Sequence, residues 1–164
     1  MIGLHSDQKS PAERAIGWFL VAMMGLSVVN VLWQVFTRFV LSNPSSYTEE
    51  LARYLLIWIG LIGAAYASGK RLHLAVDLLP KWLTGKARNR LAVAIELLVG
   101  TFAVGVLVVG GLQLVLLTLN LGQTSAALGI PLGVVYMALP CSGVLITGFA
   151  LREIRNILRS PAES

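Results

Sequence analysis

Residues 91–119 read LAVAIELLVGTFAVGVLVVGGLQLVLLTL and hold a single charged side chain, Glu96. A helix needs about 20 consecutive apolar residues to cross the hydrocarbon core of a bilayer, so this stretch is long enough to span a membrane. Three other stretches share its apolar character. We therefore predict an all-α integral membrane protein with a single domain over residues 1–164 and four spanning helices, at 16–41, 49–69, 90–119 and 131–151.

The composition excludes an ordinary soluble domain. Of the 164 residues, 56% are hydrophobic and 13% are charged, and the mean hydropathy is +0.76. The net charge of +5 does not indicate nucleic-acid binding, because the basic residues adjoin the apolar stretches. Basic residues in that position attract anionic headgroups and orient the chain during insertion, so membrane lipid is their expected partner.

The distribution of basic residues predicts the topology. Eleven of the thirteen Lys and Arg lie in residues 9–14, 70–90 and 152–159, and the connections 42–48 and 120–130 have none. Because cytoplasmic flanks carry the excess of Lys and Arg, both termini are expected in the cytoplasm of a bacterium, with the protein in its inner membrane. The first span is too long for the apolar region of a signal peptide, and we expect it to be retained.

The long connection between the second and third spans has its own pattern. In residues 72–84 apolar residues recur three and four positions apart, with charged residues between them, which is typical of a short amphipathic helix lying in the membrane interface. We expect three interfacial anchors in it: His73, Asp77 and Trp82.

Polar residues recur on one face of the first span. Asn30, Gln34 and Arg38 are four residues apart, so they share a helical face. An amide without a partner is costly in hydrocarbon, and we therefore expect this face to meet protein.

The start of the second span carries a charge cluster. Ser46 and Glu49 fit a capping box, and Glu49 and Glu50 stand four and three residues before Arg53. We predict that both carboxylates reach the Arg53 guanidinium and that Arg38 is a second partner. The cluster indicates either an ordinary helix start with a role in subunit assembly, or a contact surface or ion-sensitive site at the membrane edge.

Small residues and prolines mark packing positions. Gly60, Ala64 and Ser68 form a stripe that permits close helix approach. Pro131 suits the first turn of the fourth helix, and Pro140 is expected to kink it because proline lacks the donor for the carbonyl of Tyr136.

Residues that could carry chemistry are few. Glu96 is an intramembrane acid, which would either couple to protons or sodium, or pair with a basic residue such as Lys70, Arg71 or Arg14. The chain has no HExxH, GxSxG or P-loop motif, its single cysteine is Cys141, and both histidines lie outside the spans. We therefore expect no enzyme activity, no cofactor and no metal site.

Several short motifs together resemble the small membrane subunit of tripartite ATP-independent periplasmic (TRAP) transporters, the DctQ-like subunit. They are YTEELARY at 47–54 with Trp58, GAAYA at 63–67, HLAVDLL at 73–79, LGIP at 128–131 and YMALP at 136–140. Their order, their spacing and the four-span pattern agree with that family over most of the chain.

The resemblance implies a role rather than a reaction. It implies a non-catalytic subunit that pairs with a large multi-span permease subunit, which carries the substrate and sodium sites and moves by an elevator-type motion. A soluble periplasmic binding protein would deliver an organic acid, of the dicarboxylate or sialic-acid type. The small subunit would extend the static scaffold and help to dock the binding protein at its outer connections.

Two other functions stay open on the residues alone. One is a structural or assembly protein unrelated to transport, and the other is a small homo-oligomeric exporter that uses Glu96. Co-purification with a large permease separates the first from a transporter subunit, and replacement of Glu96 tests the second.

Overall fold

The computed structural model describes residues 11–41, 45–70 and 86–159. These residues form seven helical segments: α1 (Pro11–Phe39), α2 (Ser46–Gly69), α4 (Lys86–Phe102), the π-helical segment η2 (Ala103–Gly110), α5 (Gly111–Asn120), α6 (Leu132–Tyr136) and α7 (Ala138–Arg159). Within this part of the chain no strand occurs, only an isolated bridge between Thr124 and Pro131. The predicted all-α class is confirmed.

Four helical rods are long and apolar enough to cross a membrane, which confirms the predicted number of spans. They cover Glu13–Phe39, Ser46–Gly69, Asn89–Asn120 and Leu132–Arg159. The fourth runs past the predicted end at residue 151, because apolar and basic residues alternate at helical spacing through 152–159. The predicted interfacial segment 72–84, with His73, Asp77 and Trp82, lies outside the described residues.

The third rod consists of α4, η2 and α5 without a break. The backbone stays in the right-handed helical region at Phe102 and again at Gly111. In η2 the hydrogen bonds run from i to i+5, so that each turn holds one more residue than an α-turn. Its sequence, AVGVLVVG, consists mostly of valine and glycine, which have a weak preference for the α-helix.

The fourth rod is interrupted between α6 and α7. The interruption lies at Met137, and Pro140 follows in the first turn of α7. Proline has no N–H to donate to the carbonyl four residues earlier, that of Tyr136. Bonds on either side continue the rod, since Met137 N–H donates to the Gly133 carbonyl at 3.0 Å and Cys141 N–H donates to the Met137 carbonyl at 3.2 Å.

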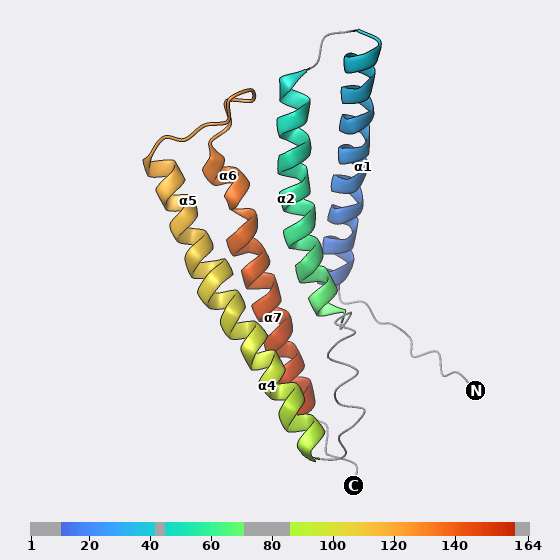
Figure 1. Ribbon diagram of the computed structural model, residues 1–164. Coiled ribbons are helices and arrows are strands. Elements are labelled where there is room, and N and C mark those ends of the chain that lie inside the picture. Colours follow the sequence, from blue (N-terminus) through green and yellow to red (C-terminus); the bar gives the residue numbers. More distant parts are fainter. Residues whose placement is uncertain (1–10, 42–44, 71–85, 160–164) are drawn as a thin grey trace, which may run out of the picture.

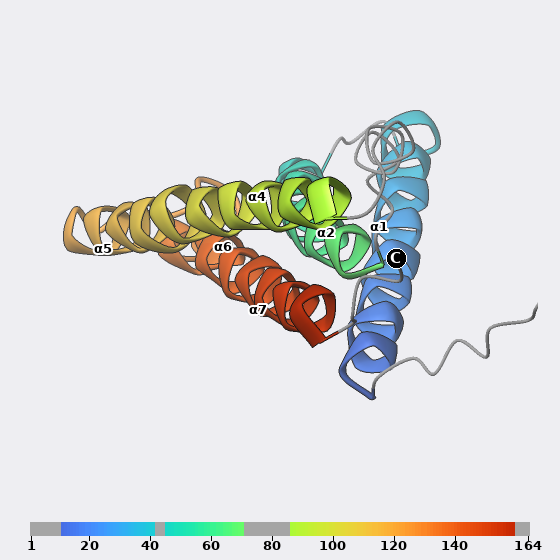
Figure 2. The same cartoon turned by 90° about the horizontal axis from the view of Figure 1, so that it is seen from below.

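The rods are arranged in an open row (Figures 1 and 2). α1 packs against α2, α2 against α7, and α7 against α4 and η2, while α5 packs against α6. Among the described residues, α1 and the third rod therefore lie at opposite ends of the row and do not pack against each other. α1 begins and α7 ends at the same end of the molecule, as an even number of spans requires.

Small residues bring the third and fourth rods close together. A Cβ atom at Gly143 would lie 2.8 Å from the Cβ of Leu107 and 3.1 Å from the carbonyl oxygen of Ala103. Gly111 and Gly133 are equally tight against the facing rod, and Ala138 is fully buried. A larger side chain at Gly111 or Gly143 would collide with backbone or with a neighbouring Cβ, and one at Gly133 would collide with the Leu119 side chain.

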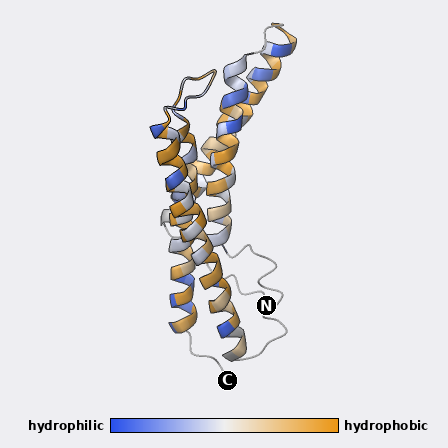
Figure 3. Ribbon diagram, turned by 60° about the vertical axis from the view of Figure 1, so that its left-hand side comes forward, coloured by the Kyte–Doolittle hydropathy of each residue, from blue (hydrophilic) through white to orange (hydrophobic). Residues whose placement is uncertain are grey.

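Most of the apolar surface stays exposed within the single chain. Only 6% of the apolar window is buried in Glu13–Phe39 and in Asn89–Asn120, against 28% in Leu132–Arg159. Hydrophobic residues dominate the middle of the rods and hydrophilic ones gather towards their ends (Figure 3). A row with such faces needs lipid or a partner protein to cover them.

Candidate functional site

The Glu50 carboxylate, near the start of α2, is bound by several donors from one distant loop. It accepts hydrogen bonds from the backbone N–H groups of Ala126 at 3.2 Å, Ala127 at 3.0 Å and Leu128 at 3.2 Å. The Ser125 hydroxyl donates a further bond to it. These donors belong to residues 121–131, the loop that joins α5 to α6, and they tie that loop to α2 across 75 to 78 positions of sequence.

The loop 121–131 is folded back on itself. Ser125 N–H donates to the Ile130 carbonyl at 2.8 Å, and Gly129 N–H donates to the Ser125 carbonyl at 3.0 Å. The tight turn needs a residue with positive φ, which Gly129 supplies at +65°. The Leu128 N–H also donates to the Ser125 hydroxyl at 3.2 Å, so the same hydroxyl contacts the turn and the carboxylate.

The two acids of α2 have different partners. The sequence predicts that both reach Arg53, but only Glu49 does so, in an exposed ion pair of 3.5 Å, whereas Glu50 turns to the loop. Successive helical residues point about 100° apart, so the two carboxylates leave the helix in different directions. Arg38, predicted as a second partner of this cluster, lies over the ring of Phe39, 5.8 Å from its centroid.

The start of α2 lies one residue earlier than the capping box predicts. Ser45 is the N-cap residue, and Ser46 is already helical. The Thr48 hydroxyl donates to the Ser45 carbonyl at 2.7 Å, and the hydroxyls of Ser45 and Thr48 are 2.6 Å apart. This hydroxyl pair takes the place of the predicted reciprocal bond between Ser46 and Glu49.

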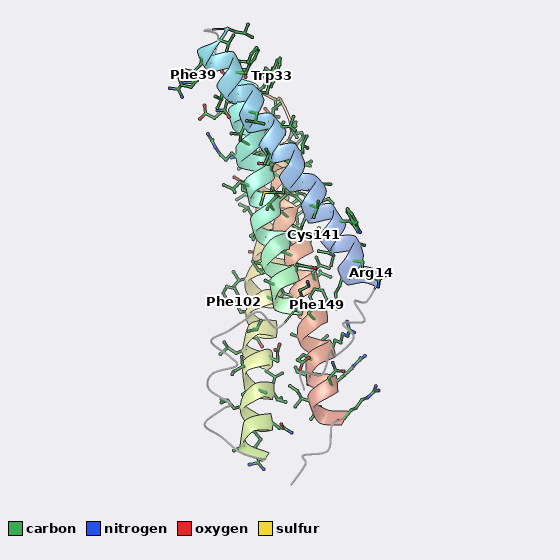
Figure 4. The ribbon with its side chains drawn as sticks, turned by 90° about the vertical axis from the view of Figure 1, so that its right-hand side faces the viewer. Arg14, Trp33, Phe39, Phe102, Cys141 and Phe149 are labelled. Carbon is green, nitrogen blue, oxygen red and sulfur yellow. The ribbon has the colours of Figure 1, made fainter. Side chains whose placement is uncertain are left out.

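Buried polar residues join α1 to α2 at the same end. Asn30, 7% exposed, donates from Nδ2 to the carbonyl of Thr48 at 2.8 Å. Nearby, Trp33 Nε1 donates to the Tyr47 hydroxyl at 3.3 Å. Gln34, from the same predicted face, is half-buried. Figure 4 shows Trp33 and Phe39 projecting from this end of α1, with Arg14 at the other end.

The predicted packing stripe on α2 faces away from the rest of the chain. Gly60 and Ala64 are exposed, Ser68 is half-buried, and no atom comes within 4 Å of a Cβ placed at Gly60. The close approach of α2 to α7 occurs at Gly69 instead, where a Cβ would lie 3.0 Å from the ring of Phe149.

Glu96 lies near one end of the third rod, not at its centre. It is half-buried and stands one turn before Gly100, whose position faces Ala150 at 3.7 Å. Phe149, the neighbour of Ala150, contacts Gly69 at the last residue of α2. Glu96 therefore lies about 6 Å beyond the level at which α2 ends.

Pro131 caps α6 and does not lie inside its first turn. It is the N-cap residue, and α6 begins at Leu132. Its carbonyl accepts the N–H of Val134 at 3.0 Å.

Several contacts were not predicted from the sequence. Arg152 of α7 donates to Glu13 of α1 at 2.9 Å and so joins the ends of the first and last rods. The role of Ser125 was also missed, although a serine four residues before a glycine is a turn signal. The sequence gives one indication of the role of Glu50: two acids precede a single arginine, so one of the two carboxylates is expected to have other hydrogen-bond donors.

The site has the chemistry of a structural tether. Within residues 11–41, 45–70 and 86–159, no three His, Cys, Asp or Glu side chains lie close enough together to hold a metal ion. Glu50 meets uncharged N–H and O–H donors, which satisfy a carboxylate without proton transfer. The arrangement thus fixes the relative positions of two rods and a surface loop.

Comparison with known proteins gives the family of this chain. Residues 27–160 match the family described as tripartite ATP-independent periplasmic transporters, DctQ component. The chain is 31% identical over 139 residues to the sialic acid TRAP transporter small permease protein SiaQ of Vibrio cholerae, covering 85% of this chain and 79% of that one. It is 25% identical to a putative TRAP transporter small permease protein of Haemophilus influenzae, over 87% and 86% of the two chains.

A longer relative shows the same segment within one polypeptide. The isethionate TRAP transporter permease protein DctMQ of Oleidesulfovibrio alaskensis is 28% identical over 147 residues, which make up 86% of this chain but 23% of that protein. TRAP small permeases thus pair with large permease subunits. The match over most of the chain and the four spans show that this multi-pass bacterial membrane protein belongs to the DctQ family, as a small permease subunit of a TRAP transporter.

Proposed function

We propose that this chain is the non-catalytic scaffold subunit of a sodium-coupled TRAP transporter that imports an organic acid. The observation that carries the proposal is the open row of rods, whose outer members have few buried residues. A closed bundle would bury more residues against its own helices, whereas a row offers a broad face to a partner. The large permease subunit is the partner that fits, and the small subunit would hold its static part while the transport domain moves.

The proposed orientation has both termini in the cytoplasm of the inner membrane. The basic residues Arg152, Arg155 and Arg159 end the fourth rod, and the loop 121–131 at the opposite end has no basic residue. Segments next to a span that carry an excess of Lys and Arg tend to lie on the cytoplasmic side of the membrane. The loop 121–131 would then belong to the outer face, where a periplasmic binding protein delivers its cargo.

The proposed cargo is an organic anion of the dicarboxylate or sialic-acid type. Relatives of this chain belong to transporters named for sialic acid and for isethionate. Since similar small permeases occur with different cargoes, recognition of the cargo belongs to the partner proteins. The described residues of this chain contain no cluster of metal-ligating side chains that would bind sodium tightly.

The position of Glu96 disfavours an exporter that uses this acid for coupling. The span Asn89–Asn120 has 32 residues and would be about 48 Å long, while the hydrocarbon core is about 30 Å thick. Glu96 is in the first quarter of that span and beyond the end of α2, so it would lie at headgroup depth. Membership in the DctQ family likewise disfavours the other alternative function, a structural or assembly protein unrelated to transport.

Co-purification tests the proposal. An affinity tag on this chain, expressed with its large permease subunit, is expected to retrieve both proteins in equal amounts from mild detergent. The Glu96→Gln variant is expected to retrieve the same complex and to support the same transport rate. Recovery of this chain alone, while the large subunit remains folded in the membrane, would contradict the scaffold function.

A further inference from the structure

We propose that Glu50 is a positioning residue that presets the loop 121–131 for the arriving periplasmic binding protein. The inference rests on the proposed function and adds to it the residue that controls docking. Glu50 does not itself contact the binding protein; it acts through the loop that it holds.

The loop conformation depends on an anion at the Glu50 position. The N–H groups of Ala126, Ala127 and Leu128 are consecutive, and all three are within 3.2 Å of one carboxylate. Consecutive amides that converge in this way form an anion-binding concavity, in which the partial positive charges repel each other unless an acceptor lies between them. Inside the loop the Leu128 N–H has a second acceptor, the Ser125 hydroxyl at 3.2 Å. For the N–H groups of Ala126 and Ala127 the acceptor is the Glu50 carboxylate.

The residues of the loop themselves present an uncharged surface. Gln123, Thr124, Ala126 and Ala127 are exposed on it, and none of them is charged. Charged residues are depleted at the centre of protein interfaces, because each must lose its water on binding. A face of uncharged residues therefore suits a soluble protein that docks briefly and leaves.

Prior ordering of the loop affects docking and not the later steps. A loop without its tether must be ordered when the partner binds, and that loss of conformational freedom weakens affinity. Once the binding protein is seated, the transport domain moves in the large subunit, which does not include Glu50. The expected signature is a higher KM for the binding protein at unchanged kcat.

The test uses the complete transporter in proteoliposomes, with purified binding protein added outside at increasing concentration. Glu50→Gln keeps the size of the side chain but removes its charge, and Glu49→Gln is the matched control one residue away. We expect Glu50→Gln to raise the KM for the binding protein about tenfold, with kcat unchanged and faster hydrogen exchange at residues 126–128. Glu49→Gln should behave as wild type.

A second variant guards against a folding defect. Ser125→Ala removes one donor to Glu50 but leaves the three amides, so its KM should lie between those of wild type and Glu50→Gln. Equal KM values for Glu50→Gln and Glu49→Gln would overturn the proposal, as would a fall in kcat alone or loss of the complex on co-purification. Failure of the proposed function would instead show in the wild type, as transport that does not require this subunit.

Discussion

Glu50 and Asn30 show how single polar side chains organise a largely apolar chain. Glu50 ties α2 to the loop 121–131, and Asn30 ties α1 to the start of α2. Both lie near the same end of the molecule, and Asn30 is buried there, so its amide would be costly to leave without a partner. The α1–α2 contact and the loop are therefore held by a few specific bonds, in addition to apolar packing.

The Asn30 bond should have a measurable energy. Asn30→Leu keeps the approximate size of the side chain but removes the donor to Thr48, and we expect it to lower the free energy of unfolding by about 1 kcal/mol. Gln113→Leu is the control, because Gln113 is exposed on α5. Denaturation of the purified chain in mixed detergent micelles measures both, and equal losses would show that the buried bond has no special weight.

The residues of the site were only partly predictable from the sequence. Spacing along one helix places Glu49 and Glu50 within reach of Arg53, and the structure bears this out for Glu49. The spacing along α2 contains no information on donors 75 positions away. Three of the donors to Glu50 are backbone N–H groups, which any residue type except proline would supply. Tertiary contacts through backbone amides leave almost no signature in a single sequence.

The number of spanning helices was predictable, but their neighbours were not. Four apolar stretches between polar connections indicate four spans because the bilayer sets a minimum apolar length. Within a span, however, residues that face lipid are as apolar as those that face protein. The small-residue stripe at Gly60, Ala64 and Ser68 permits close approach of a helix but does not say which helix, and the tight contacts within the described chain are at Gly111, Gly133 and Gly143.

Glycines that pack against another rod and glycines that face open space should respond differently when they are replaced by alanine. Gly143→Ala places a Cβ 2.8 Å from Leu107 and 3.1 Å from a backbone oxygen, and we expect a loss of about 1–3 kcal/mol of stability. Gly60→Ala meets no atom within 4 Å and should leave the isolated chain unchanged, or stabilise it by up to about 1 kcal/mol. Thermal unfolding in detergent compares the two, and a similar loss for both would refute the assigned contact between the third and fourth rods.

The π-helical segment η2 should tolerate a deletion that an α-helix does not. A wide turn holds one residue more than an α-turn, so deletion of Gly105 lets η2 become α-helical while α5 keeps the face that it turns to α6. Deletion of Leu116 within α5 would rotate the flanking residues by about 100° and displace Thr118 from its buried position.

The two deletions can be compared by their unfolding midpoints. Loss of Gly105 should cost at most about 1 kcal/mol, and loss of Leu116 several times more. Both shorten the third rod by one residue, so its length is controlled. A Gly105 deletion as damaging as the Leu116 deletion would show that η2 does not absorb an extra residue.

The molecule as a whole is a row with two broad faces and little interior. Its tightest interface, between the third and fourth rods, is built from glycine, alanine and serine, while the long apolar side chains of α1 point outward. The Arg152–Glu13 pair at one end and the Glu50 tether at the other connect the outer rods to the central ones. Such a shape suits a rigid attachment to a larger membrane protein better than a pathway of its own.

Transport by reconstituted subunits tests this scaffold function most directly. Proteoliposomes are prepared with the large permease subunit alone, with this chain alone, and with both, and uptake is followed after addition of the binding protein and a sodium gradient. We expect uptake only when both subunits are present, because the large subunit then has its static support and the binding protein its docking face. Uptake at the full rate by the large subunit alone, or any uptake by this chain alone, would contradict that function.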